Sequence, residues 1–502
     1  MHVLTEQTES KEVQSYKMYI NGEWVEAEDH STIDVINPYT NSVWAKVPNA
    51  GVADVDKAVR AAHAAFEAGE WSDVLPIQRT RILNRFADLM EANAEKIAIT
   101  DTKCNGKLIR EMHGQMKAIP NWYRYFAGAA DKIYGEVIPL EKPNTLNYTI
   151  HEPLGVVAII VPWNSPILII SYSMAPALAA GNTIVLKPSK FAPVSTLELM
   201  KVVKDAGFPP GVINTITGSG EKTGNALISH PLVKRIAFTG GTEMGKHVAK
   251  MAAQNLTGTT FELGGKSPNI VFEDANIDSA VNGILSGIFA ACGQTCVAGS
   301  RAFVQENIFD EIIKKLLART TQIKMGNPLE SNTEYGPIAN KEQFQKVEHY
   351  VNVAKTDGAQ LLYGGKPATN KDNRGLFFEP TIFKTTNEMK IAQEEVFGPI
   401  LCVIPFKDEE DVVKMANDSQ FGLAAGIWTK DIGRAHRTAK KLQAGTVWIN
   451  TYRSISYASP FGGYKGSGHG RENSLEAIRE FTQTKSIWVD MTGKMGDPFV
   501  LR

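Results

Sequence analysis

The chain has 502 residues, of which 43% are hydrophobic, so we expect two or three domains with large buried cores. Its 53 lysines and arginines are balanced by 54 aspartates and glutamates, which leaves a formal net charge of −1. This balance argues against nucleic acid or an anionic membrane surface as the partner, and favours a small molecule.

Residues 1–17 are polar and contain several glutamates, unlike a secretory signal or an arginine-rich transit peptide. The most apolar stretch, residues 155–180, is interrupted by Pro162, Asn164 and Pro166, so we expect no membrane span. The cysteines are too few for a disulfide scaffold and fit a reducing compartment: Cys104, Cys292, Cys296 and Cys402. We therefore predict a cytoplasmic protein in which a free thiol can react.

Two amphipathic helices are expected in the first part of the chain, at residues 54–69 and 78–93. The aromatic cluster at 122–126 is more typical of packing than of a site. Residues 134–150 contain glycine, proline and a Lys-Pro-Asn turn, which predicts a β-hairpin that projects from its domain. Such an exposed hairpin often joins subunits.

A regular alternation follows between residues 155 and 263, in which apolar β-branched runs are separated by helical stretches. Near-continuous apolar strands that alternate with helices predict a parallel sheet covered on both faces, the doubly wound α/β arrangement. The expected strands are 156–161, 183–186, 212–216, 234–238 and 259–263, and the expected helices are 166–180, 194–206, 222–229 and 243–253.

Polar or small residues stand just after these strands. Because ligands of open α/β sheets bind outside the carboxyl ends of the strands, these positions should meet at one edge. They are Asn164, Lys187, Gly218, Gly240 and Glu262.

A second series of the same kind runs from about residue 275 to residue 445, with strands near 302–305, 400–406 and 446–449. It predicts a second α/β domain. The last segment, 484–490, alternates like a strand and could pair with the hairpin or with a neighbouring chain.

Cys296 and Glu262 carry the strongest sign of chemistry, in Cys-Gly-Gln-Thr-Cys and Phe-Glu-Leu-Gly-Gly-Lys-Ser-Pro. Their segments are rich in small residues that let a ligand approach the backbone. A free cysteine is more often a buried hydrophobe, and an acid at a strand end is as often a structural hydrogen-bond acceptor. Together they suggest a thiol nucleophile and a carboxylate base that activates the thiol or a water.

Two glycine-rich turns, 218–224 and 240–245, each follow a predicted strand and open a predicted helix. Backbone N–H groups at such a position can accept a phosphate. Neither turn has the Gly-x-Gly-x-x-Gly or the phosphate-loop spacing, so kinase or ATPase chemistry is disfavoured, while two adjacent turns favour a dinucleotide. Lys187 could hydrogen-bond a ribose; the alternative is a solvated lysine.

Asn164 lies between a predicted strand and a predicted helix. Its amide could donate to an oxyanion at a thiol-attacked carbonyl, or it could cap the helix. Cys292 and Cys296 have no second cysteine pair and no histidine nearby, so we expect no metal, and we interpret Cys292 as a packing residue.

Taken together, these segments resemble the aldehyde dehydrogenase superfamily from about residue 19 to residue 490. The resemblance rests on ordered motifs: Pro-Trp-Asn at 162–164, Lys-Pro-Ser at 187–189, Phe-Thr-Gly at 238–240, Phe-Glu-Leu-Gly-Gly-Lys-Ser-Pro at 261–268, Gly-Gln-Thr-Cys at 293–296, Glu-Glu-Val-Phe-Gly-Pro at 394–399 and Pro-Phe-Gly-Gly-Tyr-Lys at 460–465.

The resemblance implies a hydrolytic, NAD(P)-dependent oxidation of an aldehyde to a carboxylic acid. Cys296 would attack the aldehyde carbon, and Asn164 with the Cys296 N–H would hold the oxyanion. Hydride transfer to the nicotinamide would leave a thioester, which a water deprotonated by Glu262 would hydrolyse. Glu262 argues against branches that pass the acyl group to coenzyme A. Glu472 resembles a glutamate sometimes assigned to proton relay.

The resemblance also implies a coenzyme site. Lys187 would contact the adenosine ribose, the 240–245 turn the pyrophosphate, and Glu395 and Phe397 the nicotinamide ribose and ring. The full implied set is Lys187, Ser189, Lys190, Gly220, Gly224, Gly240, Gly241, Thr242, Gly245, Leu263, Glu395 and Phe397.

Lys190 departs from the pattern of NAD-preferring relatives, which often have a glutamate three residues after the ribose lysine. A carboxylate there repels a 2′-phosphate. A cation removes that repulsion, so both NAD and NADP stay open.

By the same resemblance, five residues would line the aldehyde tunnel: Ser165, Tyr172, Tyr452, Ile455 and Phe461. This lining is aromatic and apolar, with no acid or arginine. It predicts an uncharged aliphatic or aromatic aldehyde as the substrate.

The implied architecture is an α/β fold with two doubly wound α/β domains and a small β oligomerisation element. We assign residues 1–133 and 153–263 to the dinucleotide-binding domain, 264–483 to the catalytic domain, and 134–152 with 484–502 to the oligomerisation element. The oligomerisation element predicts a homodimer or a homotetramer.

Two other functions stay open: a thiol-dependent acyltransferase or hydrolase, and a non-catalytic dinucleotide-binding protein of the same fold. The two glycine turns disfavour the first. The joint presence of Cys296, Glu262 and Asn164 disfavours the second, because a structural relative would be free to lose them.

Overall fold

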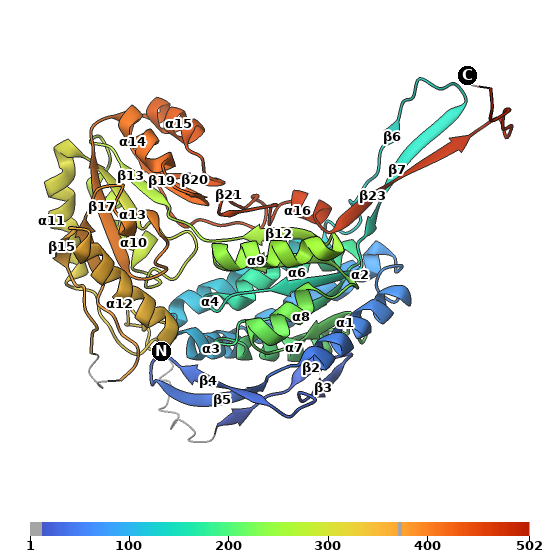
Figure 1. The fold of residues 1–502 in the computed structure, drawn as a ribbon, viewed down its shortest axis with the longest axis horizontal. Coiled ribbons are helices and arrows are strands. Elements are labelled where there is room, and N and C mark those ends of the chain that lie inside the picture. The colour runs from blue at the N-terminus through green and yellow to red at the C-terminus, as the bar shows by residue number, and fades with distance from the viewer. Residues whose placement is uncertain (1–12, 370–373, 501–502) are drawn as a thin grey trace.

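Two large β-sheets covered by helices form the body of the molecule, and a narrow β arm projects from it (Figure 1). The computed structural model describes residues 13–369 and 374–500. Most of the polar segment 1–17 therefore lies outside the described residues, as do residues 501 and 502 of the expected oligomerisation element. Within the described ranges, no helix is long and apolar enough to cross a membrane.

The first sheet has eight strands, and its centre, from β12 to β10, is parallel. Thr239 pairs with Glu262 and Ile160 with Lys187, so the carboxyl ends of these strands form one edge, as predicted. In spatial order the strands are β22 (Gly468–His469), β12 (Gly258–Glu262), β11 (Val233–Thr239), β8 (Val156–Ile160), β9 (Thr183–Lys187), β10 (Ile213–Thr215), β2 (Met18–Ile20) and β3 (Glu23–Val25).

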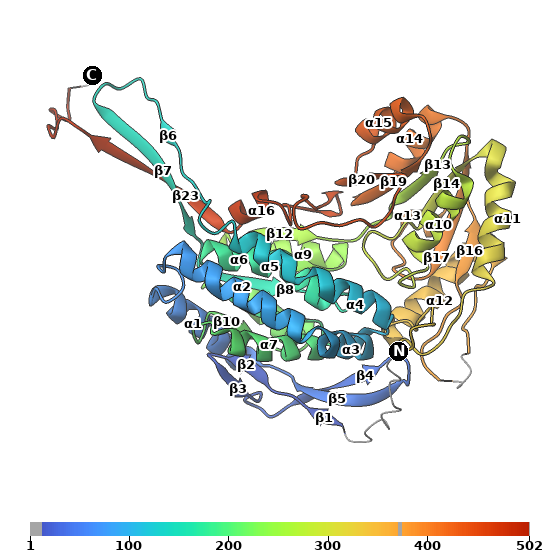
Figure 2. The same ribbon diagram turned by 180° about the vertical axis from the view of Figure 1, so that it is seen from behind.

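Each face of this sheet has its own hydrophobic core. Along β8, Val157 and Ile159 belong to one core, and Val156 and Ala158 belong to the other, which explains the continuous apolar run. The first core is covered by α2 (Pro76–Ala92), α5 (Pro120–Ala127), α6 (Pro166–Ala180) and α7 (Val194–Ala206), and the second by α1 (Val52–Glu67), α8 (Asn225–Ile228) and α9 (Thr242–Ala252) (Figure 2). The domain is doubly wound.

The helix predicted at 222–229 begins differently. Gly220–Gly224 forms a π-helical turn, η1, and α8 follows it. Thr223 Oγ1 donates to the Ala50 carbonyl oxygen at 2.7 Å, which ties this wide turn to the segment before α1. Such a contact between distant segments leaves no trace in helical periodicity.

The second sheet has seven strands and is parallel except at β15. Helices α10 (Ile277–Ile288) and α11 (Phe309–Thr320) cover one face, and α12 (Lys341–Thr356), α13 (Lys390–Gln393) and α14 (Glu409–Asn417) cover the other. The order is β15 (Gln360–Tyr363), β16 (Thr381–Lys384), β17 (Ile400–Phe406), β14 (Arg301–Gln305), β13 (Pro268–Val271), β19 (Ala424–Trp428) and β20 (Thr446–Ile449). Only β14, β17 and β20 were predicted, because short strands such as β13 are too brief to show periodicity.

The arm consists of β6 (Val137–Ile138), β7 (Thr145–Pro153) and β23 (Thr482–Asp490). The hairpin is where the sequence predicts it. Strand β23 pairs antiparallel with β7 along its whole length, from Thr482 opposite Pro153 to Asp490 opposite Thr145. Of the two pairings left open for the last strand, the chain adopts the one within itself.

The remaining elements flank these three parts. They are β1 (Gln14–Ser15), β4 (Thr32–Asn37) and β5 (Ser42–Pro48) in a small sheet, β18 (Phe421–Gly422) with β21 (Tyr464–Lys465), and the helices α3 (Ala94–Asn105), α4 (Ile109–Ala118), α15 (Ile432–Lys441), α16 (Glu476–Arg479), η2 (Ala253–Asn255) and η3 (Glu306–Ile308).

Candidate functional site

Two cavities meet at Cys296. One, of about 160 Å³, lies beside the carboxyl edge of the first sheet. The other, of about 450 Å³, is bounded by α4, α6 and the segment before Phe461. Cys296, Asn164 and Ile169 line both, so a thiol and an amide stand where the two spaces join.

Cys296 lies in the segment between α10 and β14, against the loop that follows β12. A Cβ atom on Gly265 would come within 2.5 Å of the Cys296 carbonyl oxygen, so only glycine allows this approach. Burial and the negative charges of Glu262 and Glu395 raise the pKa of the Cys296 thiol to about 12, although the Val297 N–H opposes the shift. The resting thiol is therefore protonated at neutral pH and needs a base.

Glu262 ends β12 and is only 4% exposed. Neither carboxyl oxygen has a hydrogen-bond partner among the described residues. Burial raises the pKa of Glu262 well above its usual value, and the nearby carboxylate of Glu472 raises it further. A buried carboxyl without partners and with a raised pKa is a candidate general base.

Glu472 lies next to Phe461, with which it forms a β-bridge. Ser173 Oγ donates to its Oε1 at 2.8 Å, while Oε2 has no partner. Burial raises the pKa of Glu472 to about 7. Glu472 is thus a second buried acid, close enough to Glu262 for its charge to raise the pKa of Glu262.

Asn164 follows β8 at the shared edge of the two cavities and is 5% exposed. Its Nδ2 donates to the Gln294 carbonyl oxygen at 3.1 Å, which fixes the amide from the cysteine segment. The second N–H of Nδ2 stays available for a ligand. Ser165, not Asn164, is the N-cap of α6, and no side chain caps that helix, so the helix-cap alternative for Asn164 is wrong.

Several of the residues predicted to bind the coenzyme line the smaller cavity. Glu395 Oε1 accepts a hydrogen bond from the Gly265 N–H at 2.9 Å. Phe397 has a left-handed backbone, with φ of 59°, and Gln343 Nε2 holds this turn by donating to the Val396 and Phe397 carbonyls. The walls consist of Pro162, Trp163, Asn164, Ile169, Thr239, Gly240, Gly241, Leu263, Gly264, Cys296, Gln343, Lys346, Glu395 and Phe397.

Backbone features beside this cavity suit a bound phosphate. Helix α9 starts at Thr242, beside the cavity, and no side chain caps its first N–H groups, which leaves them for a phosphate. Gly241 has open space where a side chain would stand. A Cβ on Gly245 would come within 2.6 Å of Leu263, so this glycine lets the helix pack against the cavity wall.

The residues expected near the adenosine ribose lie farther along the same sheet edge. Lys187 Nζ donates to the Gly218 carbonyl at 3.0 Å, and burial lowers the pKa of Lys187 to about 8. Gly224 lies 3.6 Å from the Lys187 side chain, measured from an ideal Cβ. Gly220 faces open space, and Ser189 Oγ accepts a hydrogen bond from the Phe191 N–H.

Lys190 is not a free cation. Its Nζ forms an ion pair with Glu342 of α12 at 3.0 Å and lies over the Phe191 ring. A carboxylate thus stands close to the position where NAD-preferring relatives often have one. It comes from the second sheet's helices, which the sequence motif did not reveal.

The larger cavity contains four of the five predicted substrate residues, namely Ser165, Tyr172, Ile455 and Phe461. Tyr452 is not among its walls, because its hydroxyl points to the Val297 carbonyl oxygen, to which it donates at 3.1 Å. It supports the cysteine segment from behind. Trp122, interpreted from the sequence as packing, does line the cavity.

Charged side chains also line the larger cavity: Lys107, Glu111 and Arg453. The expectation of a lining with no acid or arginine is therefore wrong. Lys107 and Glu111 lie close to the start of α4, almost two hundred residues from Cys296 in sequence, and only the lysine after Asn105-Gly106 could have drawn attention. The prediction of an uncharged aldehyde loses its basis.

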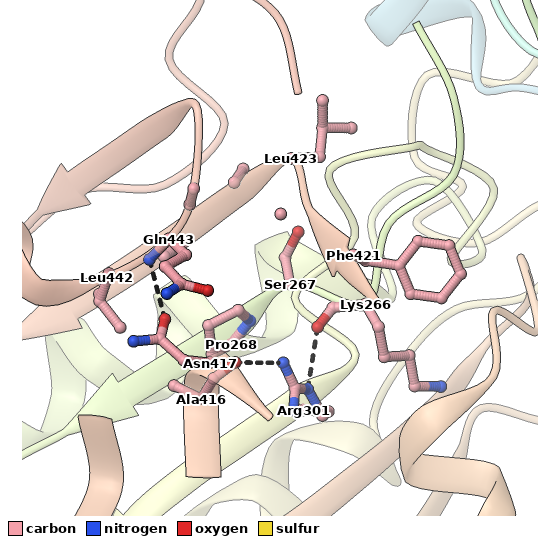
Figure 3. A pocket seen from close by; sticks show the side chains of 14 residues that line it. Lys266, Ser267, Pro268, Arg301, Ala416, Asn417, Phe421, Leu423, Leu442 and Gln443 are labelled. Atoms are coloured by element: carbon pink, nitrogen blue, oxygen red, sulfur yellow. Dashed lines mark hydrogen bonds between the residues drawn. The ribbon is translucent and has the colours of Figure 1, made fainter. Parts of the chain in front are cut away.

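A third hollow, of about 10 Å³, is too small for a substrate. Figure 3 shows Arg301 between Lys266 and Ala416. Arg301 Nε donates to the Lys266 carbonyl at 2.9 Å and Nη2 to the Ala416 carbonyl at 2.9 Å. This buried arginine holds the loop that follows Glu262, so we interpret it as structural.

The fold and site define a class of α/β proteins in which a cysteine thiol stands between two cavities, beside a helix start that is open to a phosphate. A model described as "Aldehyde dehydrogenase family" matches residues 24–487. The chain belongs to this family, and it is an NAD(P)-dependent aldehyde dehydrogenase.

Relatives and solved structures agree with this. A (Z)-2-((N-methylformamido)methylene)-5-hydroxybutyrolactone dehydrogenase of Acinetobacter baylyi is 44% identical and covers 98% of this chain and 100% of its own. Retinal dehydrogenase 2 of Homo sapiens is 41% identical over 98% of this chain and 95% of its own. The structure of betaine aldehyde dehydrogenase from Staphylococcus aureus in complex with NAD+ superposes with a TM-score of 0.95, at 42% identity, over 97% of each chain.

Proposed function

We propose that the site oxidises an aldehyde hydrolytically, with Cys296 as the nucleophile. One aldehyde, one water and one oxidised coenzyme give one carboxylate, one reduced coenzyme and two protons. The observation that carries this proposal is that Cys296 and Asn164 line both cavities, so a carbonyl bound at the thiol faces the coenzyme side.

The first step forms a bond between Cys296 Sγ and the aldehyde carbon. Since the pKa of the thiol is raised, its proton must pass to a base, and Glu262 is the buried carboxyl without partners nearby. The carbonyl oxygen becomes an oxyanion, which the free N–H of Asn164 Nδ2 and the Cys296 backbone N–H stabilise.

The bound nicotinamide supplies the hydride acceptor. Glu395 and Phe397 would orient it, and the first turn of α9 with Gly240, Gly241 and Thr242 would hold the pyrophosphate. Lys187, Ser189, Lys190, Gly220, Gly224, Gly245 and Leu263 complete the proposed coenzyme site.

Hydrolysis of the resulting thioester needs a water activated next to Cys296. After Glu262 has released the thiol proton to solvent, it takes a proton from the water, and the buried Glu472, whose charge acts on Glu262, can receive that proton onward. Cys296 leaves as the thiolate and the carboxylic acid departs through the larger cavity.

The test is the formation of reduced nicotinamide by the purified enzyme with a panel of aldehydes, with NAD and with NADP, in the presence and absence of coenzyme A. Turnover independent of coenzyme A supports the hydrolytic proposal. Acyl transfer without coenzyme reduction would instead favour the thiol acyltransferase, and no reaction with any aldehyde would favour the non-catalytic alternative.

We propose further that residues 1–133 and 153–263 bind the coenzyme and that 264–483 carry the nucleophile, in a cytoplasmic protein. Strand β22 shows that the two regions interlock, because it pairs with β12 of the first sheet although it belongs to the second region. Glu472 reaches Ser173 through the same connection.

Coenzyme choice is expected to depend on the Lys190–Glu342 pair. Glu342→Gln should raise the ratio of kcat/KM with NADP to that with NAD by about fivefold, because it frees a cation for the 2′-phosphate. Lys190→Glu should lower the same ratio at least about tenfold by repulsion. Lys201→Gln, which removes a cation on α7, is the control. Equal ratios in all four proteins would contradict this.

The arm is proposed to join subunits into a homodimer or homotetramer. Val137 is 72% exposed and Trp488 is 56% exposed, an unusual exposure of large apolar side chains on paired strands. The strands that carry them, β6 and β23, belong to the arm that projects from the body (Figure 1). Light scattering should give a dimer or tetramer mass for the wild type and a lower mass for Trp488→Glu. Ile432→Glu, on the exposed end of α15, should keep the wild-type mass. A wild-type monomer would refute the assembly.

A further inference from the structure

The wall of the larger cavity holds more positive than negative charge. Lys107 and Arg453 both pair with Glu111, at 3.4 and 2.9 Å, and both contacts end on the same oxygen, Oε1. Gln115 Nε2 lies 3.5 Å from that oxygen as well. One carboxylate thus serves two cations, and no other carboxylate of the described residues lies within ion-pair distance of either.

Two other acidic groups, Asp101 and Glu262, do not neutralise the excess positive charge of this wall. Asp101 accepts a hydrogen bond from Ser195 Oγ at 2.8 Å and does not line the cavity. Glu262 does not line this cavity either, so its described wall carries two cations and one carboxylate. One positive charge in excess therefore faces the cavity.

Both cations keep donors for a ligand. Lys107 Nζ donates to Ser165 Oγ at 2.8 Å and to Glu111, which engages two of its three N–H groups. Arg453 Nη1 donates to the Ser286 carbonyl at 3.2 Å and Nη2 to Glu111, while Nε bonds to no other described residue.

The surroundings of Arg453 hold its guanidinium in a fixed position. Arg453 has a left-handed backbone, with φ of 63°, a conformation that a non-glycine residue adopts only where its surroundings impose it. The side chain is 20% exposed and bonds to both α4 and α10. An arginine fixed in this way presents its remaining N–H edge to the cavity without further ordering.

We propose that the aldehyde substrate carries a carboxylate at the end remote from its carbonyl, and that Arg453 and Lys107 bind that carboxylate. Cys296 and Arg453 line the same cavity of about 450 Å³, a volume suited to a small ω-oxo acid. Charge-assisted contacts to a carboxylate are strong and directional, so they would orient the carbonyl end toward Cys296 and Asn164. This proposal rests on the proposed function and replaces the expected uncharged aldehyde.

The first experiment compares kcat/KM of the full-length enzyme, with saturating coenzyme, for aldehydes of equal chain length. The three members carry an ω-carboxylate, an ω-methyl or an ω-trimethylammonium group. We expect the anionic member to exceed the neutral one at least about tenfold, and the cationic member to be poorest. An anionic member no better than the neutral one would overturn the proposal.

Substitutions test whether Arg453 causes the preference for the anionic aldehyde. Arg453→Gln should reduce the anionic-to-neutral ratio of kcat/KM at least about tenfold, mainly through KM of the anionic member, and Arg453→Lys should restore part of it. Lys117→Gln removes an exposed cation from the same helix as Glu111 and should keep the wild-type ratio. Equal loss for both aldehydes in Arg453→Gln would show a structural role only.

A binding measurement is independent of turnover. Glutarate should raise the melting temperature of the wild type in a dose-dependent way, and glutaramide, its neutral diamide, should not. If the enzyme oxidises no aldehyde but glutarate still binds, the proposed function fails and the carboxylate site stands. If neutral aldehydes are oxidised and glutarate has no effect, the carboxylate site fails alone.

Discussion

Replacement of Cys296 by alanine should reduce the formation of reduced nicotinamide at least about 10³-fold with every aldehyde, because no other group can form the covalent intermediate. The thiol stands where the two cavities join, and Cys292, the nearest other cysteine in the sequence, lines neither of them. The measurement is the initial rate at saturating coenzyme, together with the coenzyme dissociation constant, which should stay within about threefold of the wild-type value.

Cys292→Ala is the matched control. The Cys292 side chain is buried in the core of the second sheet, and its Sγ donates to the Gly336 carbonyl at 3.2 Å. We expect this variant to retain most of its turnover. Substantial turnover in Cys296→Ala, or loss of coenzyme binding in it, would contradict the nucleophile assignment.

Glu262→Gln should slow both proton transfers assigned to Glu262, from the thiol and from the hydrolytic water, and the two effects can be measured separately. Without the carboxylate that activates water, hydrolysis should slow by at least about 10²-fold, a loss typical of a removed general base. If the thiol can still attack, each active site forms about one reduced coenzyme in a rapid burst and then stalls as the thioester. Stopped-flow absorbance gives the burst, and mass spectrometry of the stalled enzyme should show the acyl group on Cys296.

The pH dependence gives an independent check of this assignment. The base must be ionised, so the rate of the hydrolytic step rises with pH as the medium passes through the pKa of Glu262. That pKa is raised by burial and by Glu472, which places the rise well above the ordinary range of a glutamate. Glu472→Gln removes a neighbouring negative charge, which makes ionisation of Glu262 easier and should move the rise to lower pH. If neither Glu262→Gln nor Glu472→Gln changed the pH profile of the hydrolytic step, the assignment of Glu262 as general base would be contradicted.

The sequence predicted the first sheet well because its strands are buried on both faces. Residues such as Val156, Val157, Ala158 and Ile159 are all apolar, and the intervening helices begin or end at proline and glycine. Asn164, Lys187 and Glu262 stand at or just after the carboxyl ends of predicted strands. Because parallel strands run in the same direction, these residues could be placed at one edge of the sheet. Short strands such as β13 and β19 escaped, because a run of four or five apolar residues resembles a piece of buried helix.

The sequence predicts those parts of the coenzyme site whose residues belong to a single short motif. Gly240, Gly241, Glu395 and Phe397 belong to motifs that the chain carries intact. Gln343 and Lys346 also line this cavity, but they sit on the amphipathic helix α12, where any polar residue is ordinary. No spacing rule connects them to the glycine turns.

The sequence by itself therefore determined the fold class and the family and predicted the proposed pair of thiol and carboxyl, because each depends on residue type at short range. Only the tertiary structure decided the charges that surround the substrate and the coenzyme. Lys190 meets Glu342, and Lys107 and Arg453 share Glu111, across sequence separations of 152, 4 and 342 residues. Whether a charge is paired depends on distance in space, and the folded chain sets that distance after packing has brought remote segments together.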